Sequence, residues 1–236
     1  MPARSRAAVA SIALLLVAAC GGGHSSSAAK TTTTTSTTAG SSTTGISTPP
    51  PSSTTSTAPV SSSCTAADPN ELAGLVPQRI VPAGFVVQPD AANQTGPTDF
   101  NKAVTDDGEK DASTVLKQDG FRRGYQRLWA HQDGRKVIAV VYEFCSVGGA
   151  QAYATRAVKL GSDSTTSPFT VSGIPGAVGI ASHDTATSTA LVQATPGRYV
   201  VVASVSGPST VANESQVEQV ATDVAKSLVG ELTANV

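Results

Sequence analysis

The sequence has 236 residues, a formal net charge of −1 at pH 7 and an isoelectric point near 6.3. Hydrophobic residues make up 39% of it and aromatic residues 4%, and every aromatic residue lies after residue 63. A chain this close to neutrality has no extended basic surface to pair with phosphates. The composition therefore excludes binding driven by the charge of a nucleic acid, and we expect no nucleic-acid partner.

The first residues have the layout of a bacterial export signal. Arg4 and Arg6 precede an apolar run over residues 7–17, which ends in the lipobox-like sequence LVAAC at Cys20. The apolar run is too short to span a bilayer, and the arginines are not adjacent, which favours general secretion. We predict a signal peptide over residues 1–19 and a lipid anchor with palmitate on Cys20, because two or more acyl chains hold a protein stably on a membrane.

A long polar segment follows the lipobox. Of the 43 residues from Gly21 to Ser63, 30 are Ser, Thr or Pro, and Lys30 is the only charged one. Such a segment cannot bury enough apolar surface to offset the entropy lost on ordering. Residues 20–63 are therefore predicted to be the lipidated cysteine and a disordered tether, whose hydroxyl groups are either simply solvated or glycosylated during export.

Residues 64–236 are long enough to form one domain with a substantial core. Once Cys20 carries lipid, Cys64 and Cys145 remain as each other's possible partners in an oxidising compartment. We predict that they form a disulfide. The alternative is one buried and one exposed free thiol.

Two β-rich runs flank Asp133-Gly134, a dipeptide typical of two-residue hairpin turns. Elsewhere, helical and alternating apolar spacings and capping residues predict the other elements. In chain order we expect a short helix to about residue 76, a brief strand at 84–88, one broken helix or two short ones at 99–118, and hairpin arms at 121–132 and 135–145. A helix at 147–160, strands at 169–183 (broken at 173–176), 187–195 and 198–206, and a final helix capped by Asn213 should follow. This order predicts an α+β fold with a single antiparallel sheet of five to six strands and helices packed on it.

One arm of the predicted hairpin carries a candidate ligand-binding face. Strand alternation places Arg123, Tyr125, Arg127 and Trp129 on the same side, where guanidinium groups and aromatic rings could pair or stack with an anionic or sugar ligand. In the alternative arrangement the aromatic rings pack under a helix and the arginine stems extend past them to water.

Other chemistry has little support in the sequence. The few histidines and the acidic run 106–111 lack the spacing of zinc or calcium ligands, and we expect neither a metal nor a cofactor. Nucleophile elbows, phosphate loops and dinucleotide motifs are absent. A triad of a serine, His131 or His183, and Asp184 can be drawn only from distant segments. We therefore do not expect an enzyme, and a hydrolase remains the least favoured alternative.

The lipobox, the Ser/Thr/Pro tether and the segment from Gly120 to Trp129 together resemble actinobacterial, mycobacterial-type surface lipoproteins with one small α+β domain. The resemblance implies a Gram-positive or mycolate-type envelope and carries no catalytic residues across. The lipobox itself predicts a location at the extracytoplasmic face of the cell membrane. We expect a lipid-anchored, non-catalytic module that binds an envelope protein or another envelope ligand. The alternative is a carrier of an apolar, lipid-like ligand, suggested by two strands that are apolar on both faces.

Overall fold

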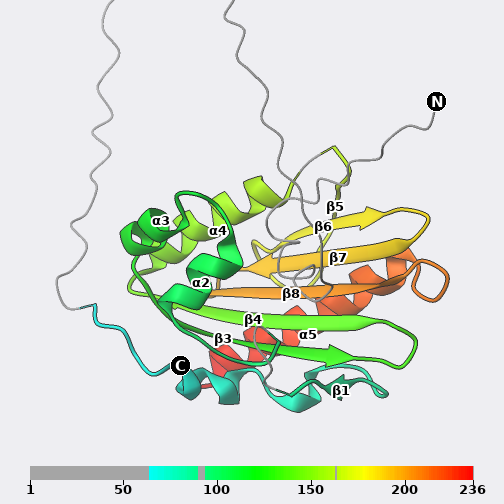
Figure 1. The fold of residues 1–236 in the computed structure, drawn as a ribbon, viewed down its shortest axis with the longest axis horizontal. Helices are drawn as coiled ribbons and strands as arrows, with labels where there is room; N and C mark the ends of the chain where they lie inside the picture. The colour runs from blue at the N-terminus through cyan, green and yellow to red at the C-terminus, as the bar shows by residue number, and fades with distance from the viewer. Residues whose placement is uncertain (1–63, 90–93, 163, 236) are drawn as a thin grey trace, which may run out of the picture.

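The computed structural model describes residues 64–89, 94–162 and 164–235, so the predictions for the signal peptide, for Cys20 and for the tether lie outside the described residues. Figure 1 shows a sheet with helices on both faces. Its elements, in chain order, are η1 (Pro69–Leu75), η2 (Gln78–Ile80), β1 (Val86–Val87), β2 (Gly96–Thr98), α2 (Phe100–Asp107), α3 (Ala112–Asp119), β3 (Phe121–Ala130), β4 (Lys136–Phe144), α4 (Val147–Gly161), β5 (Ser167–Phe169), β6 (Val178–His183), β7 (Thr187–Ala194), β8 (Tyr199–Pro208) and α5 (Glu214–Asn235).

The fold is α+β with one antiparallel sheet, as predicted, but the sheet has eight strands rather than five to six. The order is β1-β3-β4-β8-β7-β6-β5, and β2 also pairs with β3. The additional strands are short: β2 and β5 have three residues each, and both contain a proline. A segment of this length shows no period, and proline in a sheet is confined to edges and strand starts. The sequence pattern therefore predicted no strand at 96–98, and it placed the start of the first strand after the 147–160 helix only at residue 169.

The two central strands are apolar on both faces because helices cover both faces of the sheet. On one face α5 and the short 3-10 helices pack against alternate residues of β4 and β8, including Val137, Val141 and Val201. On the other face α2, α3 and α4 pack against the intervening residues, including Val140, Phe144 and Val200. In Figure 1 the latter helices lie in front of the sheet and α5 lies behind it.

Local capping explains where the helices begin and end. Asn213 and Gln216 form a reciprocal capping box at α5: each side-chain oxygen accepts from the backbone N–H of the other residue, at 2.9 and 3.1 Å. Gly108 and Gly120 end α2 and α3 in the left-handed conformation, with φ of 72° and 74°, and glycine enters this region without steric cost. Asp68 caps the first element, the predicted short helix, which is a 3-10 helix in the structure.

The β3–β4 hairpin is present, but its turn has three residues rather than the predicted two. The His131 N–H donates to the Arg135 carbonyl at 2.8 Å, and the Gly134 N–H donates to the His131 carbonyl at 3.0 Å. Gly134 has a φ of 91°. This pattern fits a turn closed by one left-handed glycine, the next most common hairpin connection after the two-residue turn.

Two adjacent glycines at the start of α4 test how closely this helix approaches the end of α3. A Cβ on Gly149 would lie 1.9 Å from the Asp119 carbonyl oxygen, whereas a Cβ on Gly148 would meet nothing closer than 3.9 Å. We expect Gly149→Ala to lower the free energy of unfolding by about 1–3 kcal/mol, because the backbone of α3 must shift. Gly148→Ala should be neutral or raise it by up to about 1 kcal/mol.

Urea unfolding followed by circular dichroism would measure both glycine variants. Equal effects at the two positions would contradict the close approach of α4 to the end of α3.

Candidate functional site

The structure brings the four predicted ligand-binding side chains of β3 together on one face and covers them with η1 and η2. Trp129 is fully buried, and its indole N–H donates to the Gln78 carbonyl at 3.1 Å. Arg127 is 7% exposed; its guanidinium donates to the Val76 carbonyl and, at 3.3 Å, to the Tyr125 hydroxyl. A ligand would therefore reach these side chains only after displacement of the covering segment.

The remaining member of this set, Arg123, belongs to an ion-pair cluster around Glu143, a residue that the sequence interpretation did not single out. Glu143 lies on β4 and is completely buried. Its carboxylate accepts hydrogen bonds from Arg122 and Arg123, both on β3, and forms an ion pair with Arg198, just before β8, at 2.9 Å. Arg123 also pairs with Glu71 in η1. A single acid within an otherwise apolar strand was the available sequence signal, because a buried charge needs partners.

The same cluster fixes the start of the domain to the sheet. Cys64 and Cys145 form a disulfide, with their Cα atoms 5.6 Å apart. Close by, Arg122 Nε donates to the Thr65 carbonyl at 3.2 Å, and Arg123 donates to the Asp68 carbonyl at 2.7 Å. We call residues 64–71 the junction segment. A covalent bond and two charge-assisted hydrogen bonds therefore hold the junction segment against β3 and the end of β4.

The serine, histidine and aspartate considered for a triad lie near one another, but not in a nucleophilic arrangement. His183 Nδ1 is 2.8 Å from Ser188 Oγ, yet this hydroxyl donates to the Ala212 carbonyl at 2.6 Å and Ser188 is fully buried. The Asp184 carboxylate accepts from the backbone N–H groups of Ala186 and Thr187, both at 2.7 Å. Hydrogen bonds of His183, Asp184 and Ser188 therefore connect the β6–β7 turn to the segment before α5.

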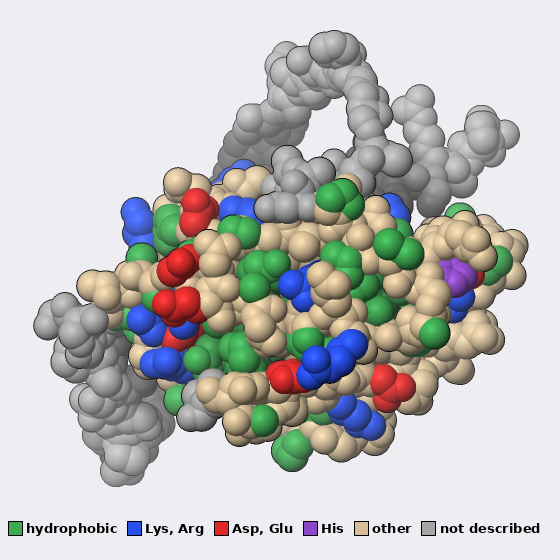
Figure 2. Space-filling view, turned by 90° about the horizontal axis from the view of Figure 1, so that it is seen from below, with side chains coloured by type: hydrophobic (Ala, Val, Ile, Leu, Met, Phe, Trp, Pro, Cys, Tyr) green, Lys and Arg blue, Asp and Glu red, His purple; other side chains and the backbone are tan. Residues whose placement is uncertain are grey.

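Residues 64–89, 94–162 and 164–235 contain no group of three or more His, Cys, Asp or Glu side chains arranged to hold a metal ion. The acidic run instead makes ion pairs between helices: both oxygens of Asp107, on α2, accept from Arg156 on α4, at 2.9 and 3.0 Å. Within the same ranges no helix is long and apolar enough to cross a membrane. Figure 2, seen from the β1 edge, shows basic and acidic side chains interspersed.

Burial raises the pKa of the Asp106, Asp107 and Asp119 carboxyl groups above the usual value of 3.8, although attraction to Lys102 and Arg156 partly offsets the effect. The folded domain therefore retains protons that the unfolded chain has lost. As pH rises from about 4 through the raised pKa values, the free energy of unfolding should fall.

Below about pH 4 the dependence reverses, and the free energy of unfolding should fall as the pH is lowered. The Thr187 and Ala186 N–H groups lower the pKa of Asp184, so its protonation on acidification destabilises the folded state. We expect greatest stability in mild acid, measured by urea unfolding across a pH series. Asp119→Asn should flatten the decline toward neutral pH, and a stability that rises steadily to about pH 8 would contradict this account.

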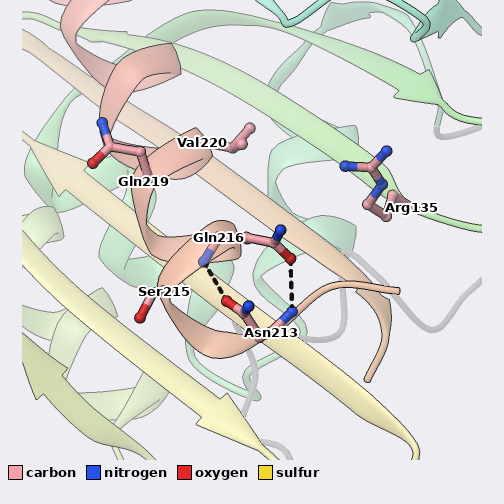
Figure 3. Close-up of a pocket in the computed structure, with 6 residues that line it drawn as sticks. All are labelled: Arg135, Asn213, Ser215, Gln216, Gln219 and Val220. Atoms are coloured by element: carbon pink, nitrogen blue, oxygen red, sulfur yellow. Dashed lines mark hydrogen bonds between the residues drawn. The ribbon is translucent and has the colours of Figure 1, made fainter. Parts of the chain in front are cut away.

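A shallow hollow of about 440 Å³ lies where the β3–β4 turn meets the start of α5. Figure 3 shows Arg135 on one side of it and the first two turns of α5 on the other. The lining residues are Arg135, Asn213, Ser215, Gln216, Gln219 and Val220. None of them was a predicted site residue, because the hairpin and α5 are far apart in the sequence.

No known family model matches the chain, and no curated protein matches it. Among solved structures, it is similar to the extracellular domain of PknH from Mycobacterium tuberculosis, with a TM-score of 0.45 and 10% identity, over 73% of this chain and 100% of that one. At this level of similarity we draw no function from the match.

Proposed function

We propose that the chain is a lipid-anchored, extracytoplasmic, non-catalytic module that binds a protein or another ligand of the cell envelope. The observation that carries the proposal is the disulfide between Cys64 and Cys145. Structural disulfides are characteristic of proteins outside the cytoplasm. The third cysteine, Cys20, lies within a lipobox pattern, so one export route accounts for all three.

A binding role is the better supported of the alternatives. Ser188, whose hydroxyl lies 2.8 Å from His183 Nδ1, is fully buried and hydrogen-bonded to a backbone carbonyl, which is unfavourable for a nucleophile that must reach a substrate. The apolar faces of β4 and β8 pack against helices on both sides, so we place the proposed binding on the surface rather than inside a carrier cavity.

Metabolic labelling with radioactive palmitate tests the anchoring part of the proposal. The wild-type chain should incorporate label and fractionate with membranes, and Cys20→Ala should lose both properties because the thiol is the acylated group. Ser26→Ala, a nearby change in the tether, serves as the control and should behave like wild type. A Cys20→Ala chain that is still processed and membrane-bound in the same way would refute the anchor.

A further inference from the structure

The strand register places the junction segment and the hollow at opposite ends of the sheet. At one end Phe121 pairs with Phe144, the residue before Cys145. At the other end Ala130 pairs with Lys136, which pairs in turn with Ser206. Strands of nine or ten residues rise roughly 30 Å between these ends. If residues 20–63 tether the domain as proposed, the hollow lies at the end remote from the point of attachment.

Arg135 is held in one position at the edge of the hollow. Its Nε donates to both oxygens of Asp133, at 3.1 and 2.9 Å, and its guanidinium lies 5.4 Å from the centre of the Phe85 ring. The stem of Arg135 crosses β8 at Gly207, where an added Cβ would lie 2.7 Å from Arg135 Cγ. The guanidinium is therefore oriented before any ligand arrives, which lowers the entropic cost of binding.

Among residues 64–89, 94–162 and 164–235, the terminal nitrogens of this fixed guanidinium have no hydrogen-bond partner. In the described part of the chain neither Nη1 nor Nη2 of Arg135 makes a hydrogen bond, because only Nε contacts Asp133. Across the hollow, Gln216 uses its Oε1 for the capping box and leaves Nε2 without a described partner, and Asn213 likewise leaves Nδ2. Figure 3 shows Gln216 on the side of α5 that faces Arg135. The facing sides therefore offer the Arg135 terminal nitrogens, Gln216 Nε2 and Asn213 Nδ2 as hydrogen-bond donors.

We propose that this hollow binds a single carboxylate group of an envelope ligand, with Arg135 as the bidentate donor and Gln216 and Asn213 as supporting donors. A planar carboxylate matches two adjacent guanidinium N–H groups. Asp133 already balances the charge of Arg135, and Glu214 and Glu218 lie nearby on α5. A polyanion is therefore disfavoured, and the hollow suits one carboxylate on an otherwise neutral molecule.

The proposal rests on the proposed function for its place in the envelope, but the site itself can be tested without it. Saturation-transfer NMR on the purified mature chain in detergent would compare N-acetylglutamate monoamide, which carries one carboxylate, with the neutral N-acetylglutamine amide. We expect millimolar binding of the acid and at least about tenfold weaker binding of the neutral amide, because charge-assisted hydrogen bonds to arginine are lost.

Three variants separate this site from a general charge effect. Arg135→Gln should abolish the difference between the probes. Arg135→Lys, which keeps the charge but not the planar pair of donors, should weaken binding of the acid. Arg79→Gln removes an arginine whose side chain is 82% exposed and lies outside the hollow, and it should bind like wild type.

Equal signals from the two probes, or unchanged binding in Arg135→Gln, would overturn the proposal. Urea unfolding would verify that each variant is folded. Palmitate labelling would be unaffected by these results, so failure of the carboxylate site and failure of the membrane anchor are distinguishable.

Discussion

Replacing both Cys64 and Cys145 by serine should lower the free energy of unfolding by about 4–5 kcal/mol, the largest effect we expect from any change in the domain. The disulfide spans a sequence separation of 81 residues. In the chain-entropy account its removal frees a long closed loop in the unfolded state. The measurement is urea unfolding of the double variant and of wild type at the same pH.

The reducing agent dithiothreitol provides the control for this prediction. It should destabilise the wild-type chain by a similar amount and leave the double variant unchanged. A thiol titration of the denatured, unreduced wild type should find neither Cys64 nor Cys145 free. Two free thiols from these positions, or a wild type that is insensitive to reduction, would show that the bond does not form.

Glu143→Gln should produce the second largest loss, about 2–3 kcal/mol. The substitution keeps the shape of the side chain but removes the charge shared by Arg122, Arg123 and Arg198. Breaking a buried ion pair commonly costs more. We expect a smaller loss in the free energy of unfolding here, because the Arg198 side chain is 44% exposed and that of Arg122 is 21% exposed, so water can solvate both after the change.

Glu231→Gln is the matched control for Glu143→Gln, because it removes the same group from the pair with Arg79, whose side chain is 82% exposed. That change should cost less than about 1 kcal/mol. Urea unfolding of the two variants gives the comparison. Similar losses in the free energy of unfolding at positions 143 and 231 would mean that burial does not increase the contribution of the Glu143 ion pairs to stability.

Repetitive patterns in the sequence were sufficient to predict the core of the fold. The apolar residues on both faces of β4 and β8 indicated interior strands, and the structure places both strands in the middle of the sheet. The cap at Asn213 was also predictable, because a capping box is local. The short strands β2 and β5 depend on their pairing partners rather than on their own residues, which explains why the predicted strand count was too low.

The candidate sites were harder to predict, because contacts between distant segments define them. Alternation correctly placed Arg123, Tyr125, Arg127 and Trp129 on one face, but nothing in that run indicates that η1 and η2 lie over it. The hollow beside Arg135 needs a hairpin turn and a helix that are separated by more than seventy residues. The apolar period within one segment does not indicate which distant segment it will pack against.

The short edge strands affect how closely copies of the domain can be packed without associating through their sheets. Pro97 in β2 and Pro168 in β5 have no N–H to offer to a neighbouring chain. Long unpaired edges invite strands from other molecules to add on and begin aggregation. In the described domain both margins of the sheet end in strands of two or three residues, so neighbouring copies can be densely crowded and still remain separate.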